Sequence, residues 1–99
     1  MERDKSEIDL NEIRKEINNI DEEIVRLIER RFNCAMKVGQ YKKKNDLPIY
    51  DENRESKVIE KCVKLLSNDH YTEYLEKLYT DIMKISKEIQ ENEVFKSDK

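Results

Sequence analysis

The first half of the chain carries an apolar ladder, a set of positions that recur in alternating steps of three and four residues. The ladder consists of Leu10, Ile13, Ile17, Ile20, Ile24, Leu27, Arg31, Cys34, Val38 and Tyr41. Such steps keep side chains on one face of an α-helix. Every position suits a buried helix seam except Arg31. Because arginine keeps its charge and is costly to bury alone, we expect an anionic group to meet it.

Local signals predict one long helix over the ladder. Asp9 and Glu12 have the spacing of a capping box, so the helix should begin near Asp9 and run to about Asn45. Gly39 lies inside this helix, and because the ladder continues beyond it we expect a close packing contact there. Pro48 disfavours helical geometry at the residue before it and so ends the segment.

Two shorter helices are predicted after the break. The second helix is capped by Asp51 or Asn53, and its stripe is Glu55, Val58, Ile59, Cys62, Leu65 and Leu66. After a turn at 67–69, the third helix carries Tyr71, Leu75, Leu78, Ile82, Ile85 and Ile89. We expect one helical domain over 8–92, between a flexible N-terminus (1–7) and a polar C-terminal tail (93–99) that frays.

The predicted lengths bear on oligomeric state. At 1.5 Å per residue the first helix would be roughly 54 Å long, whereas a compact globule of this size is only about 33 Å across. Two short helices would leave much of the ladder exposed, and a second chain is the simplest cover. We therefore predict an all-α, intertwined, two-fold symmetric homodimer with three helices per chain.

Composition narrows the class of protein. The 99 residues are 36% hydrophobic and 43% charged, with one Gly, one Pro and a net charge of -3 spread along the chain, which favours helices and gives no support for nucleic-acid binding. There is no secretory leader and no apolar run near the roughly 18 residues of a membrane span, so we expect a soluble cytoplasmic protein. Cys34 and Cys62 lack a CxxC spacing and are expected to be buried free thiols.

Several polar residues fall on or beside the apolar faces. Lys42 lies about three turns after Arg31, so both cations could meet one anionic ligand, although two such cations can also form a solvated stripe. Asp51 and Arg54 could be a simple cap and ion pair, whereas Glu55 heads an apolar stripe and could accept a hydrogen bond from a ligand hydroxyl. Ser86 and Gln90 lie one turn apart on the third helix. They are either surface residues or part of a polar pocket.

The order and spacing of these residues resemble the all-helical (AroQ-type) chorismate mutases over about residues 8 to 92. The matching pieces are Arg14 within 13–17, Asp21, Glu29-Arg30-Arg31, Val38-Gly39-x-x-Lys42, Pro48-x-x-Asp51-x-x-Arg54-Glu55 and Ser86-x-x-x-Gln90. The resemblance implies an intertwined dimer that converts chorismate to prephenate in phenylalanine and tyrosine biosynthesis.

The resemblance also implies a role for each matching residue. Arg31 and Arg14 would bind the two carboxylates of chorismate, supported by Arg54 and Ser86. Lys42 and Gln90 would donate hydrogen bonds to the ether oxygen. Glu55, with Asp51 nearby, would hold the ring hydroxyl. Arg14 and Arg31 are seventeen residues apart, about 25 Å along one helix, so Arg14 should come from the partner chain.

The implied reaction is an intramolecular pericyclic rearrangement that needs no nucleophile, base, metal or other cofactor. The sequence offers no metal-ligand cluster, phosphate loop or nucleophile–base pair, which agrees with this. Some relatives carry a glutamate at the Gln90 position, which must be protonated to donate. With Gln90 we expect activity that changes little from mildly acidic to neutral pH.

Two alternatives remain at this point. An isochorismate-pyruvate lyase uses the same fold and a similar arginine and lysine pocket. The acidic pair of Asp51 and Glu55 favours the mutase, because such lyases lack it. A non-catalytic helical dimerisation module would use the ladder only as a seam, with Arg31 paired to a partner carboxylate. The chain has no room for a regulatory or dehydratase domain and looks monofunctional, as would a segment of a longer protein.

Overall fold

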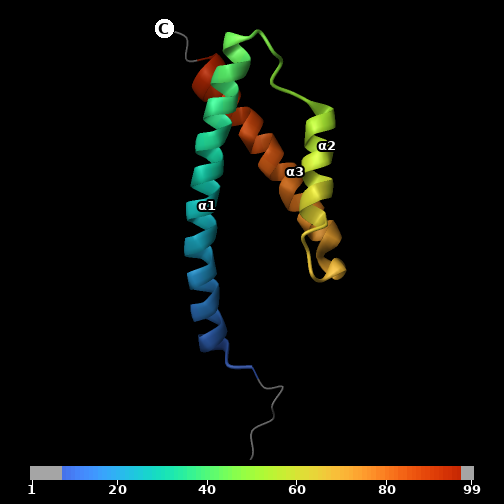
Figure 1. The fold of residues 1–99 in the computed structure, drawn as a ribbon. Helices are drawn as coiled ribbons and strands as arrows, with labels where there is room; N and C mark the ends of the chain where they lie inside the picture. The colour runs from blue at the N-terminus through green and yellow to red at the C-terminus, as the bar shows by residue number, and fades with distance from the viewer. Residues whose placement is uncertain (1–7, 97–99) are drawn as a thin grey trace, which may run out of the picture. The chain divides into compact units, whose positions relative to one another are not determined.

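A computed structural model describes residues 8–96, and within them the chain is helical without strands (Figure 1). The elements are α1 (Leu10–Lys44), α2 (Glu52–Val63), the short 3-10 helix η1 (Asp69–Tyr71), α3 (Thr72–Ile89) and the π-helical η2 (Gln90–Phe95). The prediction of one long and two shorter α-helices is confirmed. The predicted flexible segment 1–7 and residues 97–99 of the predicted tail lie outside the described residues.

Both ends of α1 are made by local hydrogen bonds. At the start, Asp9 Oδ1 accepts the backbone N–H groups of Asn11 at 3.0 Å and Glu12 at 3.3 Å, which satisfies two of the donors that a helix start leaves unpaired. At the end, Asp46 has a left-handed φ of 55°, and the N–H of Leu47 bonds back to the carbonyl of Lys42 at 2.8 Å. This is a Schellman-type C-cap, so α1 ends within one residue of the predicted Asn45.

The structure divides into two compact units, the first up to Arg31 and the second from Phe32 onward. In the described part of the first unit, the helical residues are those of α1. The ladder side chains before Arg31 are 37–57% exposed, and they are Leu10, Ile13, Ile17, Ile20, Ile24 and Leu27. A stripe of large aliphatic side chains in water is unusual for an isolated chain and typical of an interface.

The second unit contains the end of α1 together with the two later α-helices. α2 packs along α3, and Figure 1 shows these helices side by side. On α2 the predicted stripe is half-buried at Glu55, Val58, Ile59 and Cys62, whereas the prediction is wrong for Leu65, which is 78% exposed. The most buried apolar side chains of the described residues are Ala35 on α1, Met83 on α3 and Val94 in η2.

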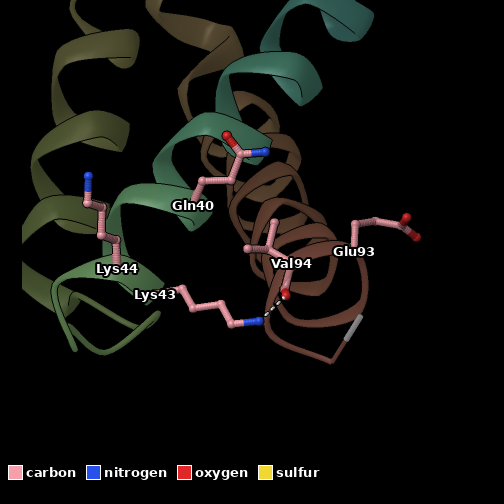
Figure 2. Close-up of a pocket in the computed structure, with 5 residues that line it drawn as sticks. All are labelled: Gln40, Lys43, Lys44, Glu93 and Val94. Carbon is pink, nitrogen blue, oxygen red and sulfur yellow. Dashed lines mark hydrogen bonds between the residues drawn. The ribbon is translucent and has the colours of Figure 1, made fainter. Parts of the chain in front are cut away.

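The C-terminal segment continues the helix further than the sequence indicates. Fraying was predicted for the tail 93–99, but η2 runs to Phe95 and Val94 is buried. Two contacts with the end of α1 account for this. The ammonium of Lys43 donates to the Val94 carbonyl at 3.0 Å (Figure 2), and a Cβ on Gly39 would lie 3.2 Å from Val94 Cγ2. The predicted close contact at Gly39 is thus confirmed, and it holds η2 in place.

Two further observations concern burial. The prediction that both cysteines are buried is wrong for this chain, since Cys34 is exposed and Cys62 is half-buried; both are free thiols. Cys34 belongs to the apolar ladder and is exposed together with Val38, the next ladder position.

None of the helices in residues 8–96 is long and apolar enough to span a membrane.

Candidate active site

Lys42 lies in the last turn of α1, with a half-buried side chain. Its ammonium donates to the backbone carbonyl of Ile49 at 2.7 Å. The short distance is typical of a charge-assisted hydrogen bond and ties the side chain to the α1–α2 connection. Because an ammonium carries three N–H donors, Lys42 retains donors for a ligand while its position is held.

Asp51, and not Asn53, caps α2. Its backbone is extended (φ −136°), and its Oδ1 accepts the N–H of Arg54 at 3.1 Å. A carboxylate at this position also complements the positive end of the helix dipole. Within residues 8–96 no ion pair joins the Arg54 guanidinium to Asp51, and the Arg54 side chain is exposed, so the simple cap-and-pair interpretation holds only for the cap.

Lys42 and Asp51 line the same open pocket. It has a volume of about 380 Å³, and its other lining residues are Leu47, Pro48, Tyr50, Glu52 and Asn53. The break that Pro48 introduces therefore brings the end of α1 and the start of α2 to one concave surface. A cation and a carboxylate at its edge suit a ligand that offers both an acceptor and a hydroxyl donor.

Glu55 faces inward from α2, and its partner was not predicted. Its Oε2 lies 3.0 Å from the ammonium of Lys87 on α3, with 22% of the Glu55 and 32% of the Lys87 side chain exposed. The same ammonium lies 4.3 Å from the centre of the Tyr50 ring. The available signal was the position of Lys87 on α3, four residues after Met83 and three before Gln90, which puts it at the border of the buried face.

Ser86 and Gln90 are buried, so the interpretation as surface residues is wrong. They share one face of α3 and η2 with Met83 and Val94, at steps of three and four. Gln90 is 6% exposed, and its buried Oε1 accepts no hydrogen bond within the described residues. Leaving a buried amide oxygen without a donor costs about 1–3 kcal/mol. Such a group needs a donor from water or from a bound molecule, because buried polar groups are nearly always hydrogen-bonded.

Gln90 is seated directly against α1. A Cβ on Gly39 would lie 3.0 Å from Gln90 Cγ and 3.2 Å from its Cβ, so only glycine allows the two helices to approach this closely here. Gln90 also marks the point where α3 passes into the π-helical η2. Changes of helical register of this kind occur often at functional sites.

Arg14 and Arg31 both belong to the first unit. Arg14 is exposed and Arg31 is half-buried on α1. Their separation of seventeen residues corresponds to about 25 Å along the helix. Two side chains so far apart on one helix do not meet around a single small ligand.

The candidate residues described above fall in a stretch that also matches a known family. A family model described as Chorismate mutase type II matches residues 13–91. The chain belongs to this family. The matched residues cover α2 and α3 entirely and most of α1, and they include every candidate residue described above.

Curated relatives agree with the chorismate mutase family. The chain is 46% identical over 57 residues to a bifunctional chorismate mutase/prephenate dehydratase of Aquifex aeolicus, covering 58% of this chain and 16% of that protein. It is 38% identical over 82 residues to a protein of the same description from Buchnera aphidicola, covering 82% of this chain and 21% of that protein. This chain thus spans about a fifth of the length of these bifunctional relatives.

A shorter relative matches as well. The chain is 36% identical over 64 residues to a chorismate mutase of Methanocaldococcus jannaschii, and the match covers 65% of each protein.

Proposed function

We propose that this chain catalyses the rearrangement of chorismate to prephenate, a step of aromatic amino acid biosynthesis. Besides membership of the family, the observation that carries the proposal is the buried pair of Ser86 and Gln90. Packing alone would favour apolar side chains at these positions, whereas a buried amide carries N–H donors that suit an acceptor of a polar ligand.

The reaction breaks one C–O bond as one C–C bond forms within the same molecule. Catalysis then requires holding the enolpyruvyl side chain over the ring and stabilising the negative charge that develops on the ether oxygen. Lys42 and Gln90 donate to that oxygen, Lys42 as a fixed charge and Gln90 as a neutral donor. The bond between Lys42 and the Ile49 carbonyl supports this role, because it positions the ammonium before the ligand arrives.

The remaining residues bind the rest of the substrate. Arg31 and Arg14 pair with the two carboxylates, since guanidinium groups match carboxylates in geometry and charge. Arg54 and Ser86 support the ligand beside them. Glu55, with Asp51 nearby, accepts the ring hydroxyl.

The working form is an intertwined homodimer in which Arg14 reaches the site of the partner chain. Two observations support this part of the proposal. The ladder side chains from Leu10 to Leu27 are largely exposed, and burial of such a stripe is a strong driving force for association. Arg14 is also too far from Arg31 along α1 for both to bind one ligand from the same helix.

The proposal is tested by supplying chorismate and isochorismate in parallel. We expect prephenate from chorismate without release of pyruvate. Release of pyruvate from isochorismate would identify a lyase. Absence of turnover with both compounds would favour a non-catalytic dimerisation module.

Lys42→Ala connects this activity with the site. We expect kcat/KM to fall about 10²- to 10³-fold, as on removal of a donor to a developing oxyanion. Lys44→Ala is the matched control, because Lys44 lies in the same last turn of α1 and is exposed. Equal losses in the two variants would contradict the role of Lys42.

A further inference from the structure

The ion pair between Glu55 and Lys87 differs from other ion pairs of the described residues. Pairs such as Lys15 with Glu12 and Arg26 with Glu22 lie within one helix, are more than half exposed and span 3.5–3.6 Å. The pair of Lys87 with Glu55 joins α3 to α2 at 3.0 Å, and both side chains are at least two-thirds buried. Exposed pairs contribute little, whereas partly buried pairs are screened less and hold a defined geometry better.

A second contact fixes the same ammonium. Lys87 lies over the ring of Tyr50 at 4.3 Å, within the range of a cation–π interaction. Tyr50 lines the pocket that also contains Lys42 and Asp51. Lys87 is therefore held from two sides, by the connection before α2 and by the first turns of α2 itself.

Two candidate site residues are close to Lys87 in the sequence. It follows Ser86 directly and precedes Gln90 by three residues, and both of these are buried. The carboxylate of Glu55 has two oxygens, of which Oε2 is next to Lys87. A carboxylate oxygen accepts more than one hydrogen bond, and the other oxygen remains for a further donor.

We propose that Lys87 is a positioning residue of the active site. By holding Oε2 of Glu55, it fixes the carboxylate so that Oε1 accepts the ring hydroxyl of the bound substrate. This inference rests on the proposed function, because the hydroxyl belongs to that substrate. It assigns to Lys87 a role that acts through Glu55 and not through direct contact with the reacting atoms.

The test is a double-mutant cycle in the full chain. Lys87→Met removes the charge and keeps the unbranched stem, Lys87→Arg keeps a charge, and Glu55→Gln removes the carboxylate. We expect Lys87→Met to raise KM about tenfold with a smaller change in kcat, and Lys87→Arg to recover most of the loss. In the Glu55→Gln background, Lys87→Met should have no further effect, because the residue through which it acts is already altered.

Controls separate positioning from a structural role. Lys84→Met changes an exposed lysine one turn earlier on α3 and should leave KM unchanged. Thermal unfolding of each variant sets a temperature at which all are folded, and Lys87→Gln replaces the Met variant if the latter does not fold. A lower melting temperature with unchanged KM would overturn the inference, as would additive effects in the cycle.

The two proposals fail in different ways. A wild-type protein without chorismate turnover would overturn the proposed function and this inference with it. An active wild-type protein whose Lys87→Met variant keeps its KM would overturn only the role of Lys87.

Discussion

Among the described residues, both units leave large apolar side chains exposed, and the second unit also buries two polar side chains. In the first unit, aliphatic ladder residues such as Ile17 and Ile24 are nearly half exposed. In the second unit, Ser86 and Gln90 are buried, and Oε1 of Gln90 accepts no hydrogen bond from residues 8–96. Contiguous exposed apolar side chains are typical of a protein interface, whereas a buried amide oxygen needs a hydrogen-bond donor. Under the proposed function, a partner chain would cover the ladder of the first unit and a substrate would bind at the buried polar residues of the second.

The largest expected effect comes from mixing two inactive variants. The experiment tests whether the partner chain contributes a residue to the substrate site. Arg14→Ala and Arg31→Ala chains alone should each lose about 10²-fold or more in kcat/KM, since each removes a charged contact to a carboxylate. After subunit exchange, one of the two sites in each heterodimer regains both arginines, so about a quarter of wild-type activity should return at statistical mixing.

The readout of that experiment is chorismate turnover after exchange has been verified with differently tagged chains. Activity that stays at the level of the separate variants would falsify the cross-chain assignment of Arg14. The exposed ladder and the buried polar residues would then serve separate purposes.

The next effect concerns the ladder alone. Ile17→Asp places a charge on a face that we expect to be covered by the partner, so it should dissociate the dimer and lower the helical content. Leu65→Asp is the matched control, since Leu65 is 78% exposed, lies between α2 and η1 and is not a ladder position. Sedimentation and circular dichroism measure both effects, and a dimer of unchanged affinity in the Ile17 variant would contradict the proposed interface.

A third prediction sharpens the role of Gln90 through pH. The amide does not ionise between mildly acidic and neutral pH, so it remains a hydrogen-bond donor. Turnover should therefore stay nearly constant over this range. Gln90→Glu must be protonated to donate, and with an ordinary carboxyl pKa of about 4.3 its activity should fall as the pH rises above that value. Profiles of kcat/KM for both proteins provide the measurement. A steep wild-type loss above pH 5 would count against Gln90.

The smallest expected effect is at Gly39. Gly39→Ala would place a Cβ 3.0 Å from Gln90 Cγ and 3.2 Å from Val94 Cγ2, so η2 must shift by a few tenths of an ångström. Overpacking of this kind costs about 1–3 kcal/mol. We expect a lower melting temperature and a several-fold loss of kcat, with a smaller change in KM. An unchanged kcat would show that Gln90 tolerates the shift.

The positions of the helix ends could largely be predicted from the sequence. Asp9 and Asp51 act on N–H groups two or three residues away, and the break before Pro48 is equally local, so the determining interactions lie within a few residues. The close contact at Gly39 was also predictable, because a glycine inside a continuing helical pattern needs a packing reason.

Other features depended on interactions between distant residues. The continuation of the helix to Phe95 rests on the bond from Lys43 to Val94, and the orientation of Glu55 rests on Lys87. The sequence alone did not distinguish Ser86 and Gln90 as buried residues from surface ones.

The sequence by itself determined the helices, their caps and the family to which their polar residues belong, because periodicity and capping act over short stretches of chain. Only the tertiary structure decided which polar side chains are buried, how far the last helix continues and which cation holds Glu55. These depend on how α1, α2, α3 and η2 of the second unit pack, and residues 55 and 87 become neighbours only through that packing.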